Sequence, residues 1–185
     1  MSDTTLLVII LVAVVVVIAL AVIFFVYRRR RGQQERQERA RQEYGPEYER
    51  MVQERGSEQE AERELRERRE KVESEIQPLS DESRRRYEER WSLVERTFVD
   101  DPVSSLDNAD RVVEEILVER NFPTDSRREA SEGVGVMHPG VVEDFREAQR
   151  VHRDAVGSQS RGDLDEMRQA IQKYRSVYER LTREG

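Results

Sequence analysis

The sequence predicts an all-α protein with three parts: an N-terminal transmembrane helix, a charged helical spacer and a small C-terminal bundle of about four helices. Three observations lead to this prediction. Residues 1–27 hold 23 of the 67 apolar residues in the chain of 185. Residues 28–77 hold only 9, whereas residues 78–185 hold 35 in stripes with a period near 3.6. No segment alternates with a period of two, which argues against strands.

The first part is a continuous apolar run from Leu6 to Val26. Its 21 residues are three alanines and 18 residues of Leu, Ile, Val or Phe. As a helix it would be about 31 Å long, which matches the roughly 30 Å hydrocarbon core of a bilayer. A cleaved signal peptide is the alternative, but the run lacks a basic N-terminal flank and a small-residue cleavage site. We therefore predict that residues 6–26 lie in the lipid bilayer.

The charges beside this run predict its orientation. No Lys or Arg precedes it, whereas Arg28, Arg29, Arg30 and Arg31 follow directly after Tyr27. The excess of basic residues on the cytoplasmic side places the N-terminus outside the cell and residues 28–185 in the cytoplasm. Tyr27 occupies the place of an interfacial aromatic residue. The four arginines act either as a stop-transfer anchor alone or also as a binding site for anionic headgroups.

The second part, residues 28–77, is a neutral connector with 14 basic and 14 acidic residues. Acid-first pairs four residues apart, such as Glu62/Arg66 and Glu64/Arg68, support a solvated helix. Its second half has a thin apolar stripe formed by Ala61, Leu65, Val72 and Ile76. Because this stripe covers only about two heptads, a semi-rigid spacer is favoured and coiled-coil pairing is kept as the alternative.

The connector is interrupted at residues 44–48, Tyr-Gly-Pro-Glu-Tyr. Proline disfavours helix at the preceding residue, so one helix is expected to end near Gln42 and the next to begin at Pro46. Two tyrosines in so polar a block are unusual. Tyr44 and Tyr48 either pack at a hinge or form a short motif that docks onto a partner.

The third part, residues 78–185, is predicted to be one small cytoplasmic domain. Ser80 is a plausible N-cap of its first helix, and Asp101 followed by Pro102 begins the second. A short helix is expected over residues 127–132 and an irregular stretch over 133–140. Two further helices follow, over 141–157 and from Leu164 onward, which suggests an up-down bundle.

The first helix of this domain carries three aromatic residues, Tyr87, Trp91 and Phe98, on one face. Trp91 is the only tryptophan in the chain. Large aromatic side chains at helical spacing usually fill a core. Docking onto a protein partner is the alternative for this cluster.

Several segments resemble a family of proteins. These segments are Tyr-Gly-Pro-Glu-Tyr at 44–48, Pro-Leu-Ser at 78–80 followed by Tyr87 and Trp91, Phe-Val-Asp-Asp-Pro at 98–102, and Ala-Asp-Arg-Val-Val at 109–113. They look like an uncharacterised family of membrane-anchored proteins from high-GC Gram-positive bacteria, usually labelled hypothetical or secreted. The resemblance covers most of residues 44–181. It implies one N-terminal helix and a helical cytoplasmic domain, but no activity.

The residues offer little catalytic chemistry. There is no cysteine, and the two histidines, His138 and His152, lack the spacings that preset a helical metal site. Neither a metal nor another cofactor is predicted, and whether the protein is an enzyme stays open. Residues 78–185 carry a net charge of −6, which repels phosphate backbones and argues against nucleic acid as a partner.

Three functions are compatible with this organisation. A single-pass membrane-anchored adaptor that binds a protein partner is favoured. A small-ligand-binding or enzymatic helical domain at the membrane is the first alternative. The second is a homo-oligomeric structural protein that self-associates through residues 58–77 or through the stripe from Leu164 to Leu181.

Overall fold

A computed structural model describes residue 24, residues 37–157 and residues 163–183. These residues are helical or lie in turns and bends, without a strand, so the predicted all-α class is confirmed for them. The chain divides into two compact units, residues 1–42 and 43–185. Of the predicted membrane segment only Phe24 is described; Tyr27 and the arginines 28–31 lie outside the described residues. Within the described ranges no helix is long and apolar enough to cross a bilayer.

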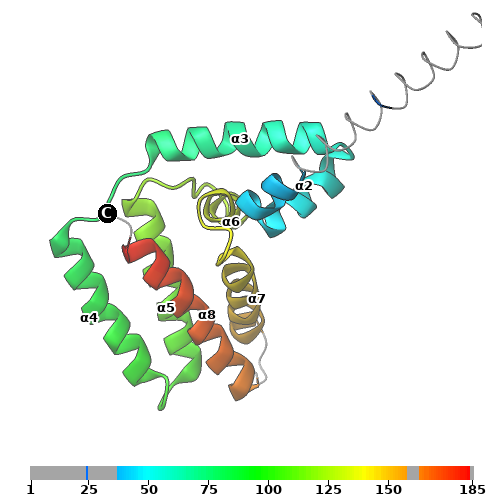
Figure 1. Cartoon of the computed structure of the whole chain (residues 1–185). Helices are drawn as coiled ribbons and strands as arrows, with labels where there is room; N and C mark the ends of the chain where they lie inside the picture. The colour runs from blue at the N-terminus through cyan, green and yellow to red at the C-terminus, as the bar shows by residue number, and fades with distance from the viewer. Residues whose placement is uncertain (1–23, 25–36, 158–162, 184–185) are drawn as a thin grey trace, which may run out of the picture. The chain divides into compact units, whose positions relative to one another are not determined.

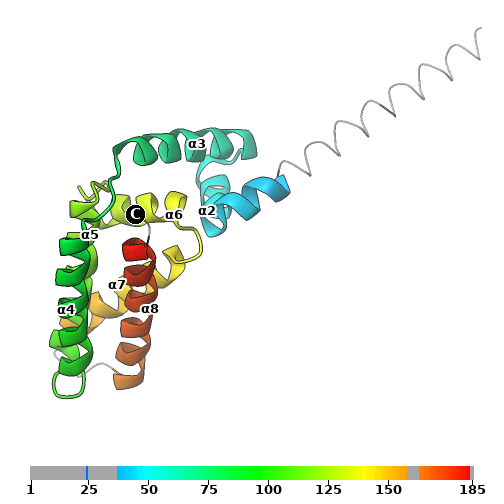
Figure 2. The ribbon, with the colours of Figure 1, turned by 60° about the vertical axis from the view of Figure 1, so that its left-hand side comes forward.

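The second unit contains the labelled helices of Figure 1. Their bounds are α2 Pro46–Arg55, α3 Glu58–Glu75, α4 Asp81–Thr97, α5 Pro102–Glu119, α6 Arg127–Met137, α7 Val142–Gly157 and α8 Leu164–Arg183. Helix α8 packs against α5 and α7, and α4 packs against α5. Helix α3 contacts α2 and α6, and it runs across the direction of α4, α5 and α8 in both views (Figures 1 and 2).

Helix starts follow local chemistry, and the predicted ones are confirmed. The Ser80 side chain accepts a hydrogen bond from the backbone N–H of Ser83 at 3.0 Å and caps α4. Asp101 caps α5, which has Pro102 at its start. Pro46 begins α2, after a turn at Gly45 with φ of 51°. The preceding helix continues through residue 44 rather than ending near Gln42.

The prediction of an irregular stretch over residues 133–140 is wrong for residues 133–137, because α6 continues to Met137. Glycine is a poor helix former, but here two glycines are needed for close packing. A Cβ on Gly133 would lie 2.9 Å from Pro123 Cγ, and one on Gly135 would lie 2.5 Å from Glu47 Cγ. The helix therefore tolerates these glycines because they let neighbouring segments approach.

The predicted boundary at 77/78 differs from the boundary of the compact unit, which begins at Glu43. The thin apolar stripe of the connector explains the difference. Ala61 and Leu65 are fully buried and Val72 is 3% exposed, so α3 uses its few apolar residues to pack within the unit. Residues 43–77 thus belong to the folded unit.

The core of the unit is aromatic and aliphatic. Trp91 of α4 stacks on Tyr178 of α8 with ring centroids 4.7 Å apart. Phe145 of α7 meets Tyr174 of α8 edge to face at 6.4 Å. The first pair joins helices that are distant in sequence and the second joins consecutive helices, and such contacts contribute beyond the area they bury.

Candidate functional site

The aromatic residues considered as docking candidates lie mainly in the interior. Tyr44, Tyr48, Tyr87 and Trp91 are each at most 5% exposed, and Phe98 is half-buried. Four of these five side chains lie in the core of the described structure, as the favoured interpretation of core packing expects. They do not come together, since the first two belong to the region of α2 and the other three to α4 and its end.

Two carboxylates are buried where α2, α3, α6 and α7 meet, and sequence reasoning did not single them out. Glu47 is fully buried and Glu132 is 7% exposed. Glu47 sits in the first turn of α2, where a carboxylate is favoured by the N-terminal partial charge of the helix. A buried carboxylate is costly unless it is paired and hydrogen-bonded, so the surroundings of both residues define the site.

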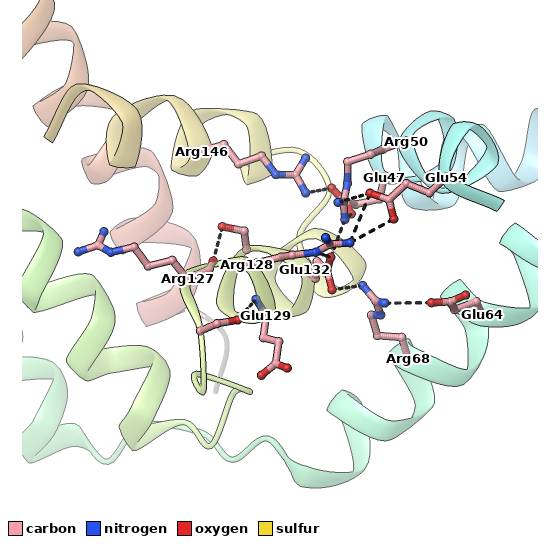
Figure 3. A network of polar contacts seen from close by, with 12 residues as sticks. Glu47, Arg50, Glu54, Glu64, Arg68, Arg127, Arg128, Glu129, Glu132 and Arg146 are labelled. Atoms are coloured by element: carbon pink, nitrogen blue, oxygen red, sulfur yellow. Dashed lines mark hydrogen bonds and ion pairs between the residues drawn. The ribbon is translucent and has the colours of Figure 1, made fainter. Parts of the chain in front are cut away.

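Glu47 is held between two arginines. Arg50 of the same helix donates to its Oε2 at 2.8 Å, and Arg146 of α7 donates to its Oε1. Gly135 of α6 lies directly against its side chain, so that a Cβ at this position would clash with Glu47. Glu47 therefore ties α2 to α7 through a guanidinium on either side, as Figure 3 shows.

Glu132 of α6 is the second centre and accepts from three arginines. Arg128 donates from Nε at 2.7 Å, Arg50 from Nη2 at 3.2 Å and Arg68 of α3 from Nη1 at 2.5 Å. Arg68 also donates to Glu64 on its own helix (Figure 3). Arg50 thus joins the two centres, because its Nη2 serves both Glu47 and Glu132.

The electrostatics of Glu132 follow from these partners. Burial by itself would raise the pKa of its carboxyl group. The hydrogen bond from Arg128 and the charges of Arg68 and Arg50 outweigh burial and hold the pKa below its ordinary value. Glu132 is therefore ionised at neutral pH and neutralises part of the surrounding positive charge.

A pocket of about 320 Å³ opens over this network. It is lined by five arginines from three helices and by three other residues: Arg50 of α2, Arg127, Arg128, Ser131 and Glu132 of α6, and Arg146, Gln149 and Arg153 of α7. The lining presents five guanidinium groups and one carboxylate. Four of these arginines also pair with carboxylates around the pocket, namely Glu47, Glu54, Asp110, Glu114 and Glu143. We call this site the arginine pocket.

A third buried acid, Asp110 of α5, fixes another arginine of the pocket. Arg127 donates to both of its oxygens, at 3.1 and 2.7 Å, and Tyr174 donates its hydroxyl at 2.6 Å. Burial and the charge of Asp110 raise the pKa of Tyr174, so its hydroxyl stays protonated. His152 lies beside this group, with Nε2 3.1 Å from Asp107 Oδ1, and is a packed helix histidine. His138 is likewise buried.

A hollow of opposite charge lies on another side of α6. It has a volume of about 400 Å³ and is lined mainly by acidic residues of α3 and of residues 123–133. Glu132 lines both this hollow and the arginine pocket. The helix therefore separates an acidic surface from a basic one.

The chemistry available at the arginine pocket is that of binding. Its lining contains arginines, one serine, one glutamine and one paired glutamate, and so lacks a nucleophile with an adjacent general base. The described ranges contain no group of three or more His, Cys, Asp or Glu residues that would hold a metal ion. Guanidinium groups are well suited to bind anions with several oxygens.

No protein-family model, curated protein or solved structure matches this chain. The family resemblance stays a prediction; it is carried by residues 44–48, 78–80, 87–91, 98–102 and 109–113.

Proposed function

We propose that this protein is a single-pass membrane protein whose helical unit is an interaction module on the cytoplasmic face of the cell membrane. The observation that carries the proposal is the junction of a 21-residue apolar run, flanked on one side by four arginines, with a folded helical unit. Insertion of the run is favoured by roughly 5 to 11 kcal/mol. The charge asymmetry supports a cytoplasmic unit.

Binding rather than catalysis is supported by the surfaces of the unit. Its core is filled by side chains such as Leu106, Ile116 and Phe145, each fully buried. The arginine pocket contains donors suited to recognition but no nucleophile with a base. Self-association through the two apolar stripes is less favoured, because Ala61, Leu65 and most apolar residues of α8 are already used within the unit.

The anchoring half of the proposal is tested by carbonate extraction and protease protection of the full chain carrying a C-terminal tag. The wild type should stay in the membrane fraction, and its tag should resist protease added outside intact cells. The double variant Val15→Arg/Val16→Arg should be released, because two arginines at a helix centre cost about 5 to 7 kcal/mol. Val99→Arg, at an exposed apolar position, is the matched control. Release of the wild type, or digestion of its tag, would contradict the proposal.

The interaction half is tested by crosslinking in intact cells followed by affinity purification. Partners should be enriched with the full chain and lost with a chain that ends after Gln42, which keeps the apolar run but lacks the second unit. Recovery of the same proteins with both chains would show that the helical unit recruits nothing.

A further inference from the structure

The arginine pocket combines fixed cations with spare hydrogen-bond donors, and we propose that it binds a phosphate group. This inference deepens the proposed function, since it names the ligand chemistry of the helical unit and rests on that unit being a binding module. The ligand class is a phosphate monoester, carried either by a lipid headgroup or by a soluble molecule.

The pocket is preorganised from behind. Arg50 and Arg146 are held by the fully buried Glu47, and Arg127 is held by Asp110, which is 2% exposed. The side chains of these arginines nevertheless keep 28%, 25% and 47% exposure. Because folding has already ordered the guanidinium groups, a ligand does not bear the entropy cost of ordering them. These arginines line the pocket from α2, α6 and α7.

The spare hydrogen-bonding capacity of the pocket consists of donors. The amide oxygen of Gln149 lies 3.1 Å from the Ser131 hydroxyl, which donates to it, whereas its Nε2 is buried and has no partner in the described part of the chain. Gln149 as a whole is 7% exposed. Arg153, one turn further along α7, is exposed and has no ion pair within the described ranges. A buried donor without a partner is unfavourable, and an acceptor-only ligand would satisfy it.

Shape and charge favour phosphate over a carboxylate. Donors reach the pocket from three helices, which suits the three terminal oxygens of a phosphate monoester better than the two coplanar oxygens of a carboxylate. The volume of about 320 Å³ is at the lower end for ligand sites, so it accepts a phosphate with a small attached group. The net charge of −7 on the chain opposes long polyanions, so the positive charge acts only locally.

The proposal is tested by titrating inorganic phosphate into the full chain in neutral detergent micelles, followed by calorimetry and by the thermal unfolding midpoint. Micelles cover residues 6–26 whatever their orientation in cells, so failure here is distinct from failure of the anchoring proposal. We expect saturable binding and a midpoint that rises with phosphate concentration. Arg153→Gln should weaken binding about five- to tenfold. Its matched control is Arg150→Gln on the same helix, which is paired with Glu147 and Asp154 and lies outside the pocket lining.

Two results would overturn the proposal: absence of saturable binding to the wild type, or an equal loss in Arg150→Gln and Arg153→Gln, which would mean non-specific attraction. Acetate that competes as well as phosphate would overturn the preference for phosphate. Nanodiscs distinguish the two sources of the phosphate group, a lipid headgroup and a soluble molecule. Phosphatidic acid in place of phosphatidylcholine should compete with phosphate if the ligand is a lipid headgroup, whereas unchanged phosphate binding identifies a soluble monoester.

Discussion

The helical unit joins its parts by two different kinds of interface. Around α8, helices α4, α5 and α7 pack through apolar and aromatic side chains such as Trp91, Phe145 and Tyr178. Around Glu47 and Glu132, helices α2 and α3 meet α6 and α7 through arginine–carboxylate pairs in addition to a few buried apolar residues such as Met51 and Leu65. Apolar burial stabilises the folded state in proportion to the buried area. For paired charges, the attraction must first exceed the free-energy cost of removing both groups from water. We infer that the first interface supplies most of the stability and that the second fixes geometry.

The largest effect is expected for a cavity in the apolar interface. Phe145→Ala removes a fully buried ring and its edge contact with Tyr174, and it should cost about 3 to 5 kcal/mol of unfolding free energy. Urea denaturation followed by circular dichroism measures this loss. Leu93→Ala, at a position 55% exposed, is the control and should change stability by less than about 0.5 kcal/mol.

A smaller and more local effect is expected in the charged interface. Glu47→Gln keeps the volume but removes the buried counter-charge of Arg146 and one of the two buried counter-charges of Arg50, which should cost about 2 to 3 kcal/mol. Hydrogen exchange should show lost protection in α2 and α3, with α5 and α8 retained. Glu70→Gln, on the exposed face of α3, should leave exchange unchanged. Uniform loss of protection would show that the two interfaces are one cooperative structure.

The third prediction concerns pH. The pKa of Glu132 is held below its ordinary value, so its stabilising contribution is complete above about pH 4.3 and is lost as the pH falls through the lower folded value. Near pH 6 the free energy of unfolding of the wild type should exceed that of Glu132→Gln by about 1 to 2 kcal/mol. This difference should shrink on acidification to about pH 3. Urea titrations of both proteins at each pH measure it, and a constant difference would contradict the assigned ion pairs.

The smallest effect is expected at the glycine that contacts Glu47. Gly135→Ala would overpack the site, which should lower the free energy of unfolding by about 1 to 3 kcal/mol. The higher helix propensity of alanine offsets this loss by about 1 kcal/mol. A net loss of about 1 kcal/mol in thermal or urea unfolding is expected. Gly140→Ala, where an added Cβ meets nothing within 4 Å, should be neutral.

The two interfaces also differ in how far the sequence predicts them. The apolar one follows from local patterns: the stripe of α4 and the caps at Ser80 and Asp101 are encoded within a few residues. The charged interface depends on contacts between residues that are 82 and 99 positions apart in the chain. Among 39 acidic and 32 basic residues, nothing local marks which pairs become buried.

One signal of the charged interface lies in the sequence, at Gly133 and Gly135. Local propensity assigns glycine to turns and so predicts an irregular stretch there. Their small size instead admits Pro123 and Glu47 against α6. Two glycines spaced by one residue, next to a helical segment, indicate close packing as well as a turn.

The stack of Trp91 on Tyr178 has a practical consequence. Because Trp91 is the only tryptophan in the chain, its intrinsic fluorescence reports on the contact between α4 and α8. We expect this fluorescence to be insensitive to the detachment of α2 and α3. Circular dichroism, in contrast, records every helix. If α2 and α3 detach first, ellipticity will decrease during denaturation before the emission maximum shifts. The protein thus carries a built-in optical reporter of which interface opens first.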